Sequence, residues 1–268
     1  YPTSFQFGRA LEQLIQTEYP SALNSRRAAM SDVGLARSLN EDNWGWTHLV
    51  GNTNLYVVAD GMGGHDKGEV ASEMAVETIC REARARLQYA TSINTEGLEN
   101  VLDESFQCAN NSIKDHSEMM GSDMGTTMVA ALLENDRVAL IANVGDSRAY
   151  LVRGKVLHQI TRDHSLVARM VEQHRIRPEE ARHHPHSNIL LRTVGTERNV
   201  DIDIFRVDLV EDDILLLCSD GLWGEVDDED IEAILNHYTD LRIGCRELVR
   251  AAHQGGGKDN VTVIVVQV

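Results

Sequence analysis

Acidic residues stand at the ends of several apolar runs in this chain, and this arrangement constrains its fold more than any other feature. The positions are Asp60 after residues 55–59, Asp220 after residues 214–219, and Asp259 just before residues 261–266. Each apolar run has the composition of a buried strand. A carboxylate at the end of a buried strand is unfavourable unless its charge is compensated, and a divalent cation does this through oxygen ligands. The sequence therefore predicts that several strand ends meet at one oxygen-rich metal centre.

The acidic set also includes Asp42, with Glu41 beside it. Carboxylates enclosed together repel one another and cannot all stay ionised without cations. Two cations about 3.5–4 Å apart, bridged by one carboxylate and one water, would relieve the repulsion. Asp60 is the predicted bridge because it ends a central strand, and the Gly61 carbonyl can approach a metal because no side chain intervenes. With oxygen ligands only, the metal is Mg²⁺ or Mn²⁺ rather than Zn²⁺, and the shared water becomes a hydroxide-like nucleophile for a phosphate ester.

Three further residues suit the chemistry of a phosphate ester. Arg37 lies on the segment that leads to Asp42, and its planar guanidinium can hold two phosphate oxygens, although such a residue taken alone is usually a surface arginine. His65 follows the predicted glycine turn and can donate a proton to the leaving alkoxide; taken alone, it would be a solvated loop histidine. Asp146 lies between two predicted strands and is either an ordinary turn aspartate or a ligand of a third, weakly held ion.

Other motifs are less specific. The tract HHPH at residues 183–186 resembles a metal site, but adjacent histidines around a proline usually point apart, so we expect a structural or solvated role. The glycines at residues 63–64 lack the Lys-Ser/Thr pair of a phosphate-binding P-loop. The chain also has no G-x-S-x-G run of the kind that carries the nucleophile of a serine hydrolase.

The hydrophobic pattern predicts an α+β fold in which two antiparallel sheets pack face to face with helices outside. Predicted strands cover residues 28–35, 43–49, 54–60, 125–133, 137–144, 146–153, 155–160, 203–209, 213–218 and 261–267. Predicted helices cover residues 67–90, 96–119, 227–237 and 241–253, with weaker pieces near 165–173 and 178–183. Residues 1–27 read as an N-terminal extension or linker, so the predicted domain covers residues 28–268.

Composition excludes several classes of partner. The net charge of −17 argues against nucleic acid and against adhesion to an anionic membrane. The four cysteines, Cys80, Cys108, Cys218 and Cys245, are far apart and read as free thiols in a reducing compartment. No apolar run approaches the roughly 18 residues of a membrane span, and no secretory signal stands at the start. We therefore expect a cytoplasmic protein, although a first residue other than Met keeps open a trimmed or longer chain.

Several runs follow one another in an order typical of a single protein family. They are GLARSLNED at residues 34–42, VADGMGGH at 58–65, GEVAS at 68–72, MGTT at 124–127, NVGDSR at 143–148, SDGLW at 219–223 and KDNVT at 258–262. On these runs the chain resembles the metal-dependent protein serine/threonine phosphatases of type 2C, in their compact bacterial form. One such run would be weak support, whereas this many in order, over about residues 28–268, are specific.

The resemblance implies a four-layer αββα sandwich with a dinuclear centre at one end and a flap subdomain, at about residues 161–192, that affects substrate access. It implies that Asp42, Asp60 and the Gly61 carbonyl hold one ion, with Glu41 acting through water, and that Asp60, Asp220 and Asp259 hold the other. Asp146, with Asp220, matches a third metal position. Arg37 would bind the substrate phosphate, and His65 would be the proton donor.

The sequence thus predicts an enzyme: a protein serine/threonine phosphatase in which a metal-bridging hydroxide attacks phosphoserine or phosphothreonine directly. Its cofactors would be two Mn²⁺ or Mg²⁺ ions, with a third held weakly. We expect a monomer that acts in signalling on phosphorylated proteins. The alternative is a catalytically silent domain of the same fold that binds phosphoproteins, which would require a missing metal ligand, and none is missing. A two-metal nuclease is disfavoured by the charge, whereas a phosphatase domain within a larger regulatory chain is compatible.

Overall fold

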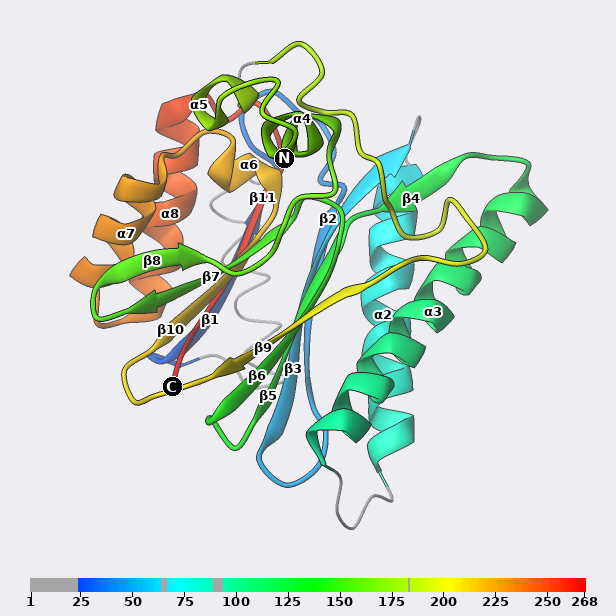
Figure 1. Cartoon of the computed structure of the whole chain (residues 1–268), viewed down its shortest axis with the longest axis horizontal. Coiled ribbons are helices and arrows are strands. Elements are labelled where there is room, and N and C mark those ends of the chain that lie inside the picture. The colour runs from blue at the N-terminus through cyan, green and yellow to red at the C-terminus, as the bar shows by residue number, and fades with distance from the viewer. Residues whose placement is uncertain (1–23, 64–66, 89–93, 183) are drawn as a thin grey trace, which may run out of the picture.

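The computed structural model describes residues 24–63, 67–88, 94–182 and 184–268. Two antiparallel sheets pack face to face, and helices cover both outer faces (Figure 1). One sheet has the strand order β1-β11-β10-β7-β8; the other has the order β2-β3-β5-β6-β9, with β4 paired to β3.

The strands are β1 (Arg27–Asp32), β2 (Asp42–His48), β3 (Thr53–Gly63), β4 (Met124–Thr126), β5 (Met128–Glu134), β6 (Val138–Val144), β7 (Arg148–Arg153), β8 (Val156–Gln159), β9 (Asp203–Asp208), β10 (Ile214–Cys218) and β11 (Val261–Gln267). The helices are α2 (Lys67–Leu87), α3 (Thr95–Met120), α4 (Leu166–Glu172), α5 (Pro178–Ala181), α6 (Asp220–Trp223), α7 (Asp228–His237) and α8 (Leu241–Gly255).

Strand β3 explains how the layers are held together, because it is buried on both faces. Successive side chains of a strand point to opposite faces of its sheet. Leu55 and Val57 accordingly pack in the cluster that joins this sheet to α2 and α3. Tyr56 and Val58 pack in the cluster between the two sheets. A third cluster joins the other sheet to α7 and α8, so the predicted αββα architecture is confirmed.

The structure corrects several predicted boundaries. Strand β3 continues to Gly63 and pairs with β4, so Gly61 and Gly63 extend the strand where a turn was predicted. The single strand predicted for residues 125–133 is divided between β4 and β5. The strand predicted from residue 146 begins at Arg148, because Gly145, with φ of +107°, turns the chain between β6 and β7. Helix α6 was not predicted.

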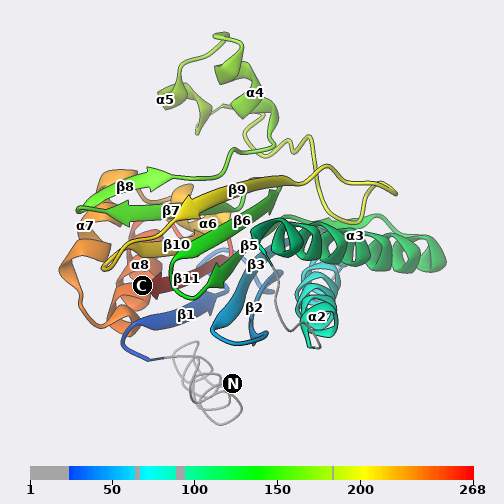
Figure 2. The same ribbon diagram turned by 60° about the horizontal axis from the view of Figure 1, so that its bottom comes forward.

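The segment between β8 and β9 stands away from the sandwich and carries α4 and α5 (Figure 2). It contains the predicted flap, whose bounds stay a prediction. Arg182 ties this segment to the turn before α7 through an ion pair with Asp227 and a 3.2 Å hydrogen bond to the carbonyl of Val226. The predicted extension at residues 1–27 lies mostly outside the described residues, so the domain boundary also stays a prediction.

The four cysteines are free, as predicted, and Cys218 and Cys245 are buried. None of the described helices combines the length and the apolar character that crossing a bilayer requires.

Candidate active site

The predicted aspartates converge on one end of the sandwich from both sheets. Asp42 and Asp60 are direct partners in the antiparallel register of β2 and β3. Asp220 follows β10 at the start of α6, and Asp259 precedes β11, the antiparallel neighbour of β10. The two sheets meet at this end, where Ser219 Oγ, directly after β10, donates to Asp42 Oδ2 of β2 at 2.7 Å. The fold therefore brings together the four aspartates that the sequence singled out.

Burial and mutual repulsion raise the pKa values of these carboxyl groups. Burial is the largest cause for Asp42, whose pKa rises to about 7, and for Asp220, whose pKa rises to about 6 with a further contribution from the charge of Asp259. The pKa of Asp60 lies well above its usual range, first through burial and then through Asp42, Asp220, Asp146 and Asp259 in that order. Asp60 thus interacts with all the other aspartates of the site and lies at the electrostatic centre of the cluster.

Two carboxylate oxygens of the cluster are buried without a hydrogen-bond partner, Asp42 Oδ1 and Asp220 Oδ1. The other oxygen of Asp42 accepts a hydrogen bond from Ser219 Oγ at 2.7 Å. A buried acceptor without a partner is unfavourable unless a donor or an ion completes it. As they stand, no three or more His, Cys, Asp or Glu side chains of the described ranges are positioned to hold a metal ion. The donors are carboxylate oxygens, which are the type of ligand that a hard divalent cation takes.

The backbone beside Asp60 is packed too tightly for any side chain at position 61. A Cβ on Gly61 would come within 2.0 Å of the Gly68 carbonyl oxygen and 2.7 Å of the Glu41 carbonyl oxygen. The N–H of Gly61 donates to that Glu41 carbonyl at 3.1 Å, and Ser72 Oγ donates to it at 2.6 Å. The start of α2, the entry to β2 and the end of β3 therefore hold one another in place around Asp60.

Arg37 lies on the loop between β1 and β2 and reaches the acidic cluster. Its Nη2 donates to Asp259 Oδ2 at 2.7 Å, and its Nη1 lies 4.0 Å from Glu41 Oε2. The hydrogen bond to Asp259 is the largest cause of the raised pKa of Arg37. Its side chain is 47% exposed, so the guanidinium can meet a ligand from solvent. His65, the predicted proton donor, lies outside the described residues, so its role stays a prediction.

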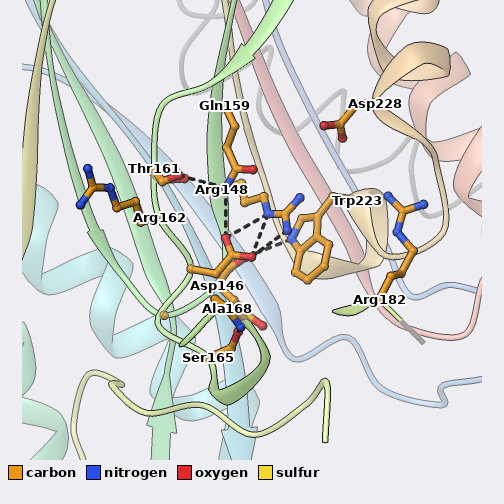
Figure 3. A network of polar contacts seen from close by, with 12 residues as sticks. Asp146, Arg148, Gln159, Thr161, Arg162, Ser165, Ala168, Arg182, Trp223 and Asp228 are labelled. Carbon is orange, nitrogen blue, oxygen red and sulfur yellow. Dashed lines mark hydrogen bonds and ion pairs between the residues drawn. The ribbon is translucent and has the colours of Figure 1, made fainter. Parts of the chain in front are cut away.

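Asp146 lies in the turn between β6 and β7 and is almost fully buried. The indole Nε1–H of Trp223 donates to the Asp146 carbonyl at 3.0 Å, and the Arg148 guanidinium lies over that indole, 3.7 Å from the ring centroid (Figure 3). Arg148 also pairs with Asp163 at 2.7 Å and donates to the Tyr150 hydroxyl at 2.9 Å. The pKa of Asp146 is raised well above its usual range by burial and then by Asp220. Asp146 thus belongs to the same acidic cluster, and a network that begins at the flap supports its backbone.

Replacing Arg148 with lysine should lower the free energy of unfolding by about 1–3 kcal/mol, because its guanidinium is mostly buried, with a side chain that is 15% exposed. A lysine there cannot at once make the forked bonds to Asp163, the bond to the Tyr150 hydroxyl and the contact with the Trp223 ring. Urea unfolding followed by circular dichroism measures this change. Arg153→Lys is the matched control at the other end of β7, since Arg153 also contacts an aspartate, Asp213, through two nitrogens but has a side chain that is 42% exposed. Equal losses in the two variants would contradict the importance of burial for the Arg148 network.

A cavity of about 790 Å³ adjoins the acidic cluster. Its lining includes Asp146, Asp220 and Asp259 on one side, and Val167 and Val171 of α4 on the other. The predicted flap therefore forms one wall of the cavity that opens onto the cluster.

Sequence reasoning missed several residues that support the site. Ser219, Asn260 and Trp223 each lie next to or within a recognised run, but they hydrogen bond to residues far away along the chain. Each carries a polar side-chain group at a buried or half-buried position within one of these runs. That combination is the sequence signal from which their supporting role could have been predicted.

The comparisons with known proteins agree with this arrangement. A family model described as "Protein phosphatase 2C" matches residues 36–252. "Serine/threonine phosphatase stp" of Listeria monocytogenes is 42% identical over 239 residues, which cover 88% of this chain and 93% of that protein. A solved serine/threonine phosphatase of S. agalactiae has a TM-score of 0.83 at 32% identity and covers 90% of this chain and 98% of its own. The catalytic domain of PstP in complex with two manganese ions has a TM-score of 0.78 at 34% identity, over 90% of this chain and 97% of its own.

Proposed function

The chain belongs to the protein phosphatase 2C family and is a serine/threonine protein phosphatase, and on this premise we propose which of its residues carry the reaction. The enzyme depends on a divalent metal, as its family and the manganese complex of a relative support. We assign Asp42, Asp60, the Gly61 carbonyl and, through water, Glu41 to one Mn²⁺ or Mg²⁺ ion. We assign Asp60, Asp220 and Asp259 to a second, and Asp146 with Asp220 to a third that is weakly held.

The position of Asp60 carries this assignment. Its pKa is raised first by burial and then by the charges of Asp42, Asp220, Asp146 and Asp259, and it lies opposite Asp42 in the register of β2 and β3. The unpaired oxygens of Asp42 and Asp220 lie in the same cluster. When bound, divalent cations would activate water for attack on phosphorus and stabilise charge on the phosphoryl oxygens.

Residues of the chain orient the substrate around this centre. Arg37 holds two oxygens of the phosphate through its guanidinium, at the cost of its ion pair with Asp259. His65 donates a proton to the leaving oxygen of serine or threonine, so that the product leaves as a neutral alcohol. Desolvation of Asp60 strengthens the electrostatic interactions that it makes with its neighbours.

The substrates would be proteins that carry phosphoserine or phosphothreonine. We propose that the enzyme works as a cytoplasmic monomer in signalling. The net charge of −17 supports a partner other than nucleic acid.

Hydrolysis of a phosphothreonine peptide by metal-stripped protein tests this function. Turnover should fall at least about a hundredfold on stripping, because metal ions supply several kcal/mol of transition-state stabilisation, and it should return on addition of Mn²⁺ or Mg²⁺. Calorimetric titration with Mn²⁺ provides the control that the protein still binds the ion. A folded protein that binds Mn²⁺ and the phosphopeptide without turnover would favour the silent phosphoprotein-binding domain instead.

A further inference from the structure

The loop that joins β1 to β2, residues 33–41, carries Arg37 and is here called the Arg37 loop. It has no regular secondary structure, so its shape must come from contacts with other segments. The side chain of Arg37 is 47% exposed, and within the described part of the chain its tip is held by Asp259 and more distantly by Glu41. The place of the guanidinium therefore depends on how firmly the backbone of the loop is held.

Asn260, between Asp259 and β11, holds that backbone at both ends. Its Nδ2 donates to the Val33 carbonyl at 3.0 Å and to the Leu39 carbonyl at 2.9 Å. Its Oδ1 accepts from the Glu41 N–H at 2.8 Å. Asn260 is only 4% exposed, so water does not replace these bonds easily. One buried side chain thus uses both of its amide donors and its acceptor on residues that flank Arg37.

The middle of the loop rests on the same segment of chain. The N–H groups of Leu35 and Ala36 donate to the Gly257 carbonyl at 2.7 and 3.2 Å. Gly34 has φ of +77°, and a Cβ there would lie 2.2 Å from the Asp259 carbonyl oxygen. These contacts hold the middle of the loop against residues 257–260, whereas Asn260 holds the two ends of the loop.

We infer that Asn260 is a positioning residue for phosphate binding, because its side chain sets the place of Arg37 through the backbone of the Arg37 loop. This inference rests on the proposed function, in which Arg37 binds the substrate phosphate. If the loop is already ordered, the guanidinium of Arg37 can bind phosphate without the loss of conformational entropy that ordering the loop would require. The side-chain hydrogen bonds of Asn260 go to the backbone of Val33, Leu39 and Glu41, so its effect on phosphate would be exerted through the loop.

Inorganic phosphate, the product, is the probe of this inference, measured as a competitive inhibitor of phosphothreonine-peptide hydrolysis by the Mn²⁺-loaded enzyme. Asn260→Ala should raise both the inhibition constant of phosphate and KM by about tenfold or more, with a smaller change in kcat, in the range expected for a misplaced binding group. Isothermal titration with Mn²⁺ should give an affinity within about twofold of the wild type, because the Asp259 carboxylate is left in place and the Glu41 carbonyl is still held by the Gly61 N–H and Ser72 Oγ.

Asn110→Ala is the matched control. Asn110 is also fully buried, and its side chain also donates to two backbone carbonyls, those of Glu197 and Arg198, and accepts from one N–H, that of Gly195. Both variants should lose thermal stability, but only Asn260→Ala should weaken phosphate binding. Equal phosphate inhibition of the two folded variants would overturn the inference.

A double-mutant cycle separates an effect through Arg37 from any other. In the Arg37→Ala background, Asn260→Ala should change phosphate inhibition by less than about twofold, because the group that it positions is already gone. An undiminished loss in that background, or a large loss of Mn²⁺ affinity, would overturn the inference. Should Asn260→Ala fail to fold, Asn260→Ser keeps a small polar side chain but is too short to reach both the Val33 and the Leu39 carbonyls, and the same results are expected of it. If Arg37→Ala alone leaves phosphate inhibition unchanged, the role proposed for Arg37 is wrong, and the inference falls with it.

Discussion

Replacing Asp60 with asparagine should lower turnover of a phosphothreonine peptide by a thousandfold or more, on the order of the losses that follow removal of a central catalytic group. Asparagine preserves the shape of the side chain but removes the charge that interacts with every other aspartate of the cluster. In the proposed assignment, the substitution would also remove a ligand that two ions share. Steady-state hydrolysis over a range of Mn²⁺ concentrations measures the effect, and added metal should not restore the rate.

The same substitution should leave the fold intact and should raise the thermal stability of metal-stripped protein. Burial and neighbouring carboxylates raise the pKa of Asp60, so its ionised form is less favourable in the folded protein than in the unfolded chain. This penalty applies at pH values above the unfolded pKa, and asparagine removes it. Asp213→Asn is the control: Asp213 is buried, with 2% of its surface exposed, but it pairs with Arg153 outside the acidic cluster, so this variant should lose stability and keep its activity. Near-normal turnover in Asp60→Asn would contradict the dinuclear assignment.

Replacing Gly61 with alanine should destabilise the protein by about 3 kcal/mol or more, in the range of severe overpacking. The new methyl group would lie 2.0 Å from the Gly68 carbonyl oxygen and 2.7 Å from the Glu41 carbonyl oxygen. Both oxygens belong to the backbone and cannot rotate away. Relief of the clash would separate β3 from the start of α2 and displace Asp60. We therefore expect a lower midpoint of urea unfolding and also a large loss of Mn²⁺ affinity.

Gly244→Ala is the control for this prediction. Gly244 lies within α8, where the nearest heavy atom to a new Cβ, on Tyr238, is 4.0 Å away. Alanine there should raise the free energy of unfolding by about 0.5–1 kcal/mol, because it favours the helix without a clash. If both alanine variants changed stability alike, the tight packing around Gly61 would not be the cause.

The sequence predicts the sandwich because its central strands have no polar face. The runs that become β3, β10 and β11 are continuous and apolar, and each is buried between neighbouring strands. The sequence predicts strand boundaries less well where a polar residue interrupts an apolar run without ending the sheet. Residues 125–133 read as one strand, yet the chain divides at Thr127, whose N–H donates to the Asp60 carbonyl at 2.8 Å. That partner is distant in the chain, and periodicity contains no information about it.

The residues of the candidate site also fall into those that the sequence predicts and those that it does not. Carboxylates and the arginine are recognisable from the sequence, because their charges are unusual next to buried strands. Asn260 and Trp223 are not, because an asparagine or a tryptophan fits many environments, and their role follows only from partners that lie 227 and 77 residues away. Helix α6 escaped prediction for a related reason, since one turn is too short to give a helical period.

The acidic cluster draws its members from both sheets, with Asp42 and Asp60 on one and Asp220 and Asp259 beside the other. An ion held by aspartates from both sheets would therefore link the two sheets, and it would be bound only when the sheets are packed together in the folded protein. By mass action, a ligand that binds only the folded form stabilises it, by about 2.7 kcal/mol at one hundred times its dissociation constant. The supply of divalent cations would then set the lifetime of the folded protein as well as its rate of turnover.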